Sequence, residues 1–124
     1  MKPTYWEDEQ VQVKAHRPPE RFDVVVLQPP DQPESLYLKR VIGLPGERID
    51  YQGGKLYVNK VRVRDPFAEE TEDFTWENHY KDPIPSGYYF ILGDNRRISK
   101  DSRSFGLVSE KQLLGIVKEG KNAK

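Results

Sequence analysis

The sequence predicts an all-β fold of antiparallel sheets connected by β-hairpins. Over most of the 124 residues, apolar side chains recur at every second position, which is the period of a strand with one buried face. The stretches between them are rich in turn residues, and the chain holds 9 glycines and 10 prolines. Leu, Ile, Val and Phe make up about a quarter of the chain, and its length suits one domain, so we expect residues 1–124 to form a single domain.

The first strands follow from alternation and from the positions of proline. Residues 11–15 read Val-Gln-Val-Lys-Ala and predict a strand with one buried face. Residues 22–28 are denser in apolar side chains, as suits a strand covered on both faces. The prolines in residues 16–20 and 29–33 cannot donate to a ladder, so these segments are expected to be connections. The next strand then spans residues 36–44, before a Pro-Gly pair.

Two tight hairpins are expected next. Gly53-Gly54 stands between the strand-like residues 48–51 and 56–58, and a glycine pair is typical of a two-residue hairpin turn. A second tight turn at Asn59-Lys60 leads into a strand at residues 61–64.

Residues 65–85 have no apolar period, and we expect them to form the most mobile part of the chain, without a helix of three or more turns. Their acidic run at residues 69–73 is interpreted as a solvated surface excursion, because the ligand spacing of a calcium loop is absent. The remaining expected elements are strands at residues 88–92, 107–108 and 113–117, and one helical turn at residues 109–112 with Ser109 as its N-cap.

Composition argues against several functional classes. The 20 basic residues cancel the 20 acidic ones and form no stripe, so we expect no nucleic-acid partner. The chain has no cysteine, which excludes disulfides, thiol catalysis and Cys-ligated zinc. The two histidines, His16 and His79, stand in unrelated loops, so neither a His-based metal site nor a Ser-His-Asp triad is expected. No apolar run approaches the roughly 20 residues that span a bilayer.

Lys39 is the first candidate for chemistry. Alternation along the predicted strand places it on the same face as Tyr37 and Val41, while Arg40 points to the other face. If the Lys39 face is covered, desolvation lowers the pKa of the amine and makes it a general base near neutral pH. The alternative is a lysine that extends its amine to water, and the pattern by itself favours that alternative.

The second candidate is the polar segment of residues 93–106, which follows an apolar strand. Its density of Asp, Asn, Arg and Ser suits a hydrogen-bonded platform, although composition by itself favours a simple turn. Asp101 and Arg103 are spaced so that they could form a bidentate pair.

Three segments together resemble conserved blocks of bacterial type I signal peptidases, the membrane-anchored Ser-Lys proteases that cut signal peptides from exported proteins. Residues 21–26, Arg-Phe-Asp-Val-Val-Val, resemble the block usually written Arg-Gly-Asp-Ile-Val-Val, and we take Phe22 to be tolerated in a strand. Residues 37–47 resemble the block with the general-base lysine, and residues 93–106 resemble the last block. Enterobacterial members carry a large extra domain where this chain has only residues 65–85, so it resembles the compact Gram-positive type.

The resemblance implies roles for four residues. Lys39 matches the general base, which takes the proton of the nucleophilic serine and returns it to the leaving amine. Ser99 matches the residue that hydrogen-bonds the lysine amine and orients it. Asp101 and Arg103 match a pair that supports this loop. The resemblance implies no metal and no organic cofactor, and its substrates are preproteins whose signal peptides bind as an added strand.

The nucleophile block of the family reads approximately Ser-Met-x-Pro-Thr, and this chain opens Met-Lys-Pro-Thr at residues 1–4. We therefore expect the serine just before Met1 in a longer, membrane-anchored parent protein, with residues 1–124 as its extracytoplasmic catalytic domain at the cell membrane. The chain as it stands is expected to be inactive. Tyr5 and Trp6 either face the lipid interface or pack in the core.

Two other functions compete with this interpretation. The first is a non-enzymatic relative that acts as an assembly factor, for example in pilus biogenesis; the presence of Lys39 and Ser99 argues against it, and the residue before Met1 discriminates. The second is a self-cleaving Ser-Lys repressor, but its glycine-flanked cleavage region and its DNA-binding half are not visible in the sequence.

Overall fold

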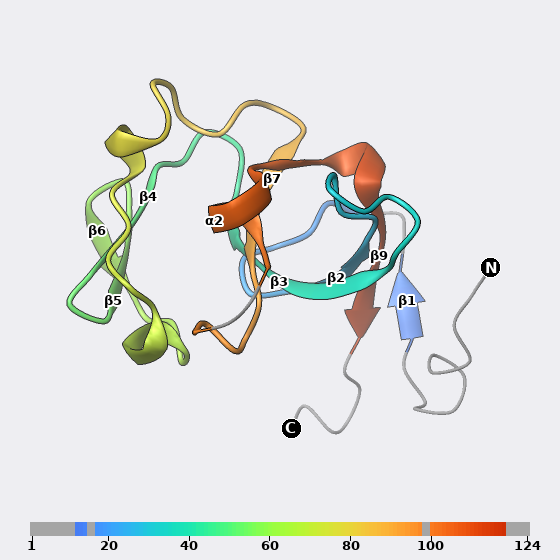
Figure 1. The fold of residues 1–124 in the computed structure, drawn as a ribbon, viewed down its shortest axis with the longest axis horizontal. Coiled ribbons are helices and arrows are strands. Elements are labelled where there is room, and N and C mark those ends of the chain that lie inside the picture. The colour runs from blue at the N-terminus through green and yellow to red at the C-terminus, as the bar shows by residue number, and fades with distance from the viewer. Residues whose placement is uncertain (1–11, 15–16, 98–99, 119–124) are drawn as a thin grey trace.

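The computed structural model describes residues 12–14, 17–97 and 100–118, which form two antiparallel sheets (Figure 1). The larger sheet has the order β1-β9-β2-β3-β7-β8, and the smaller has the order β4-β5-β6. The all-β prediction is confirmed. The strands are β1 (Gln12–Lys14), β2 (Val24–Leu27), β3 (Tyr37–Gly43), β4 (Ile49–Gln52), β5 (Lys55–Val58), β6 (Val61–Val63), β7 (Tyr88–Leu92), β8 (Val108–Ser109) and β9 (Leu113–Lys118); the short helices are η1 (Ala68–Glu70), η2 (Trp76–Asn78), α2 (Ser102–Phe105) and η3 (Glu110–Gln112).

Both predicted hairpins are confirmed. Gly53 and Gly54, with φ of 58° and 75°, connect β4 to β5. Asn59 and Lys60, with φ of 52° and 73°, connect β5 to β6. Two consecutive left-handed residues give a turn the twist that matches the flanking strands, which explains why each loop needs only two residues.

The predicted C-terminal helical turn is also present as η3. The Ser109 hydroxyl accepts a hydrogen bond from the backbone N–H of Lys111 at 3.1 Å, and the Gln112 side chain accepts one from the N–H of Ser109 at 2.9 Å. This reciprocal capping satisfies N–H groups that a helix start leaves without a partner.

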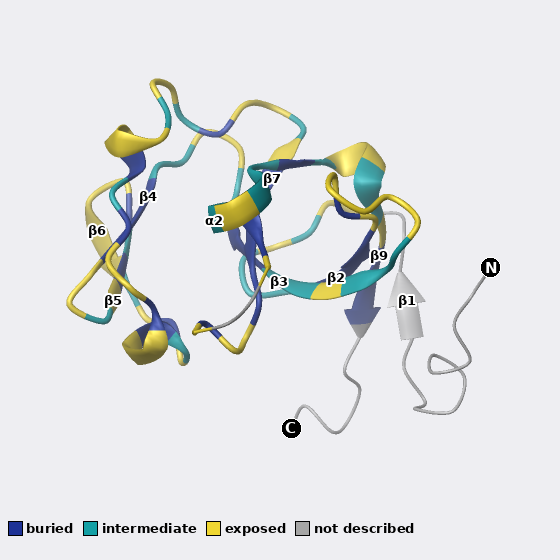
Figure 2. Cartoon of the chain, in the orientation of Figure 1, coloured by how far each residue is buried: buried dark blue, intermediate teal, exposed yellow. Residues whose placement is uncertain are grey.

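The core has two main parts, and the buried residues that form them are dark blue in Figure 2. One part lies between the two sheets, and the buried residues of the other all come from strands of the larger sheet, which curls around it (Figure 1). The buried residues between the sheets are Ile42, Ile49, Tyr51, Leu56, Val58, Ala68, Phe74, Trp76, Ile84, Phe90 and Leu92. Those inside the curl, here called the inner cluster, are Val25, Leu27, Val41, Tyr89, Ile91, Val108 and Ile116.

Residues 65–85 are more than a surface excursion. The acidic side chains in residues 69–73 are exposed, as expected, and no helix of three turns occurs in the segment. Phe74 and Trp76, however, are buried in the core between the sheets, and Phe74 exchanges two 2.9 Å backbone hydrogen bonds with Tyr51. The segment therefore covers β4 and supplies apolar side chains, a role that its aperiodic sequence does not indicate. Its mobility stays a prediction.

The expectation that Phe22 lies in a strand is wrong. β2 begins at Val24, and Phe22 occupies a turn with φ of 74°, a left-handed conformation that glycine adopts most easily. Its N–H donates to the carbonyl of Val41 at 2.7 Å, which fixes the turn against β3. This conformation gives a physical reason for the glycine that the related block usually carries here.

We expect Gly43→Ala to lower the free energy of unfolding by about 1–3 kcal/mol, because the added methyl overpacks the contact between the sheets. A Cβ at Gly43 would lie 2.7 Å from Ile84 Cδ1 and 2.8 Å from Ile49 Cγ1. Urea unfolding measures the effect. Val61→Ala, at a side chain that is 64% exposed, is the control and should change stability by less than about 0.5 kcal/mol. An unchanged midpoint for Gly43→Ala would contradict this packing.

Candidate active site

Lys39 lies in β3 on the face that the alternation predicts. Its strand neighbours on that face are Val41, which is fully buried in the inner cluster, and Tyr37, which packs against the same cluster. Lys39 is half-buried, and its Nζ lies 5.1 Å from the centre of the Tyr37 ring. The lysine therefore stands at the rim of an apolar interior instead of extending freely into water.

Burial lowers the pKa of Lys39 below the ordinary value of a lysine amine. Charged groups among the described residues modify this effect: Asp101 and Asp94 raise the pKa, whereas Arg103 lowers it. Desolvation is the largest contribution, so the net direction is downward. A lysine with a lowered pKa holds a larger fraction of neutral amine near neutral pH and can accept a proton.

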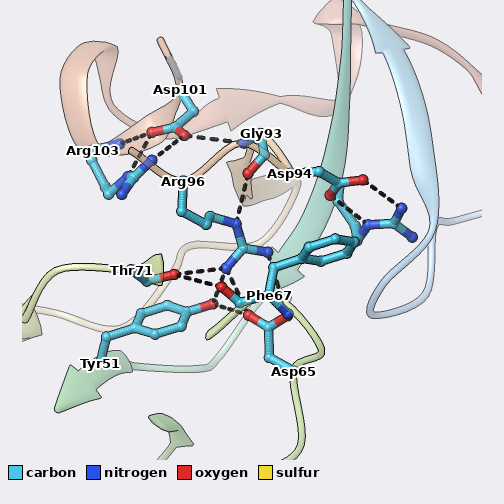
Figure 3. Close-up of polar contacts among 10 residues, drawn as sticks. Tyr51, Asp65, Phe67, Thr71, Gly93, Asp94, Arg96, Asp101 and Arg103 are labelled. Carbon is cyan, nitrogen blue, oxygen red and sulfur yellow. Dashed lines mark hydrogen bonds and ion pairs between the residues drawn. The ribbon is translucent and has the colours of Figure 1, made fainter. Parts of the chain in front are cut away.

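Asp101 organises the loop that faces Lys39. Its fully buried carboxylate accepts hydrogen bonds from Arg103 Nε at 2.9 Å and from Arg103 Nη2 at 2.7 Å, the bidentate pair that the sequence predicts (Figure 3). It also accepts from the backbone N–H groups of Arg103 and Gly93, at 3.1 and 3.0 Å. One carboxylate thus caps α2 and fastens the loop to the end of β7.

Ser102 ties the same loop to the strand. Its hydroxyl, which is buried, accepts a 2.9 Å hydrogen bond from the backbone N–H of Ile91 in β7. β7 is paired with β3, where Arg40 lies opposite Leu92. The loop therefore folds back along the strand beside the one that carries Lys39.

Of the four predicted site residues, the structure brings Lys39, Asp101 and Arg103 into one electrostatic environment. Ser99 lies outside the described residues. The roles of all four residues stay predictions.

Arg40 and Asp94 form an ion pair that the sequence analysis did not single out. Arg40 points to the face of β3 opposite Lys39 and donates to Asp94 from Nε at 2.8 Å and from Nη2 at 2.7 Å. Its Nη1 donates to the carbonyl of Phe22 at 3.0 Å. The sequence carries a signal for this pair, because Arg40 stands between Leu38 and Ile42 on a largely apolar strand face. A charge in such a position needs a partner.

Arg96 is the second missed residue, and its side chain is fully buried. The guanidinium donates to the carbonyl of Gly93 at 2.6 Å and to both oxygens of Asp65, at 2.7 and 3.4 Å. It also donates to the hydroxyls of Thr71 at 3.0 Å and Tyr51 at 3.3 Å (Figure 3). The loop after β7 is thereby joined to the layer of the smaller sheet.

The surroundings of Asp65 in this buried network favour its ionised form. Burial alone would raise the pKa of Asp65, but hydrogen bonds from Arg96, Tyr51 and the Phe67 N–H, with the charge of Arg96, leave it lowered. Burial raises the pKa of Tyr51, so its neutral phenol donates to Asp65 at 2.7 Å. Asp65 is therefore an anion that accepts hydrogen bonds from Arg96, Tyr51 and the Phe67 N–H.

Within the part of the chain that the structure describes, no three His, Asp or Glu side chains gather in a way that could hold a metal ion. None of the helices in this part is both long and apolar enough to cross a membrane.

Comparison with known proteins gives the family of this chain. The family model described as signal peptidase, peptidase S26, matches residues 1–119. The chain belongs to the signal peptidase family. The resemblance noted from the sequence blocks is thereby confirmed.

Relatives of this signal peptidase family member include signal peptidase I V of Bacillus subtilis strain 168, with 38% identity over 134 residues, covering 96% of this chain and 79% of the relative. Signal peptidase IB of Staphylococcus aureus strain Mu50 is 38% identical over 96 residues, covering 65% of this chain and 50% of the relative. A crystal structure of a signal peptidase I from Enterococcus faecalis V583 matches with a TM-score of 0.74 and 34% identity, over 82% of this chain and 98% of that one. The chain thus spans half the length of the staphylococcal relative and most of the other two.

We expect Asp101→Ala to lower the free energy of unfolding by on the order of 3 kcal/mol. The substitution leaves the mostly buried Arg103 guanidinium and the buried N–H of Gly93 without their acceptor. Thermal or urea unfolding measures the loss. Glu70→Ala, which breaks the exposed ion pair with Arg97, is the control and should cost less than about 1 kcal/mol. An unchanged melting temperature for Asp101→Ala would make the pair dispensable.

We expect the Lys39 amine to titrate below the ordinary value of a lysine, because burial outweighs its acidic neighbours. NMR of the lysine side chains across a pH series measures this directly. A short lysine-containing peptide in the same buffer gives the ordinary value for comparison. Titration of Lys39 at that value would rule out the general-base assignment.

Proposed function

We propose that this protein removes signal peptides from exported preproteins as a Ser-Lys endopeptidase in which Lys39 is the general base. The observation that carries the proposal is the position of Lys39 on the face of β3 that borders the inner cluster, where burial lowers the pKa of its amine, and Asp101 and Arg103 brace the loop whose charges act on it. Membership of the signal peptidase family supports the same reaction class.

The proposed reaction needs one base in two protonation states. Neutral Lys39 accepts the proton of the serine hydroxyl as its oxygen attacks the scissile carbonyl carbon. The resulting ammonium donates that proton to the leaving amine when the peptide bond breaks and an acyl-enzyme forms. Lys39 then accepts a proton from the water that attacks the ester, and its ammonium returns a proton to the serine oxygen as the ester bond breaks and the signal peptide leaves as the free acid. Ser99 is proposed to orient the amine through both steps.

The surroundings of Lys39 suit this cycle. The inner cluster on one side keeps the neutral amine favourable, while Asp101 and Asp94 stabilise the transient ammonium. Because Arg103 neutralises part of the Asp101 charge, the acidic neighbours do not hold the lysine permanently protonated.

We further propose that the substrate is an extended signal peptide at the cell membrane, with residues 1–124 acting as the catalytic domain on the extracytoplasmic face of an anchored parent protein. An extended peptide can pair its main chain with an exposed strand, which leaves the side chains near the cut to set specificity. No metal or organic cofactor takes part in the proposed mechanism.

The test places a serine directly before Met1, which completes the Ser-Met-x-Pro-Thr pattern. We expect the extended chain to cleave a signal-peptide substrate, whereas the chain that begins at Met1 does not. Lys39→Ala in the extended chain should abolish cleavage, because an unassisted serine hydroxyl is a weak nucleophile at neutral pH. Product formation is followed by mass spectrometry.

Lys55→Ala is the matched control, because it removes an exposed lysine of the smaller sheet and should leave cleavage unchanged. Cleavage that persists after Lys39→Ala would refute the Ser-Lys mechanism. A correctly folded extended chain with no activity would favour a non-enzymatic assembly factor instead.

A further inference from the structure

We propose that Arg96 is a positioning residue for Lys39, acting by fixing Gly93 on the side opposite Asp101. The inference rests on the proposed function of Lys39 and extends the working site to the layer of the smaller sheet. Arg96 itself is not proposed to touch the reacting atoms.

Gly93 is held at both of its backbone polar groups. Its N–H donates to Asp101 at 3.0 Å, and its carbonyl accepts from Arg96 Nε at 2.6 Å. The residue is buried and directly follows β7, so it is the point at which the chain leaves the sheet and enters the loop (Figure 3). Asp94, the next residue, is one of the charged groups that act on Lys39. The position of Gly93 therefore fixes the start of the loop relative to the amine.

The far end of the Arg96 side chain is anchored in the other layer of the molecule. Tyr51 lies in β4, Asp65 follows β6, and Thr71 follows η1, and all three receive hydrogen bonds from the guanidinium. The side chains of Arg96 and Asp65 are both 0% exposed, so water cannot replace either partner. Moving the guanidinium would leave a buried anion without its cation, which makes this a stiff connection.

The neighbouring Arg97 provides an internal contrast. It pairs at 3.0 Å with Glu70, which lies in η1 directly before Thr71, a partner of Arg96. The side chains of Arg97 and Glu70 are 76% and 56% exposed. Solvent screens such a pair, and its contribution is small. Arg96 and Arg97 therefore contact the same part of the fold, but only the buried Arg96 is held rigidly there.

Among the described residues, the charged groups that act on Lys39 are Asp101, Asp94 and Arg103, and all three belong to the polar segment of residues 93–106. The nearby Tyr37 ring contributes an apolar surface from β3 itself. Loosening Gly93 would let the loop move away from the amine and admit water, which weakens the desolvation that lowers the pKa of Lys39. We therefore expect disruption of the Arg96 network to raise the pKa of Lys39.

The experiment titrates the Lys39 amine by NMR in this chain and in two variants, so that it does not depend on catalysis. Arg96→Lys keeps the charge but loses the planar fork, and Tyr51→Phe keeps the ring but loses one hydroxyl of the network. We expect an upward shift of the Lys39 pKa in both, larger for Arg96→Lys. Arg97→Lys is the matched control and should leave the pKa where it is.

In the serine-extended chain, the acid limb of the kcat/KM profile should move to higher pH in the same order. For Arg96→Lys we expect a roughly tenfold loss of kcat/KM below the pKa of the base, with KM nearly unchanged. A purely structural role would lower the melting temperature without moving either titration, and that result would overturn the proposal.

Two further outcomes are decisive. If Arg96→Lys does not fold, Tyr51→Phe answers the question through the same titration, because it preserves the Arg96–Asp65 ion pair. If cleavage survives Lys39→Ala, the proposed function fails, while an unchanged Lys39 pKa in the folded variants separately refutes the positioning role of Arg96.

Discussion

Consecutive side chains of a strand face opposite sides, and the arrangement of this molecule depends on that constraint at β3. Lys39 faces the inner cluster, while Arg40, one position further, faces the other way and pairs with Asp94. Strand β3 therefore presents the proposed base, Lys39, to an apolar interior, and its next residue, Arg40, binds the beginning of the polar loop through Asp94. A shift of one position in the register of β3 would exchange the two charges and destroy both arrangements.

Buried charges connect the loop after β7 to the layer of the smaller sheet. The Arg96–Asp65 pair has a defined geometry, and both of its side chains are 0% exposed. Asp101 also fixes the loop, through partners that are closer in the sequence, since it accepts hydrogen bonds from both Arg103 and Gly93. Such networks define one arrangement of the loop in preference to many similar ones.

Local sequence explains the features that can be predicted here. The glycine pair at residues 53–54 supplies the left-handed turn, and Asp101 lies only two positions from Arg103, so each depends on near neighbours. Alternation likewise places Lys39 on the correct face. Arg96 and Asp65 are 31 positions apart, and they meet because the smaller sheet packs against the larger one, which no periodic pattern encodes. β2 begins two residues later than the apolar run of residues 22–28 predicts, and Phe22 lies in the turn before it with a left-handed backbone.

The place of β9 in the larger sheet has a consequence for how the molecule is assembled. β9 lies between β1 and β2, pairing with both, so these two early strands have no contact through the ladder until a strand from the other end of the chain enters. During synthesis on the ribosome, the larger sheet cannot be completed before β9 has emerged. Closing contacts of such long sequence separation slows folding, and the strand edges of β1 and β2 stay exposed until β9 pairs with them.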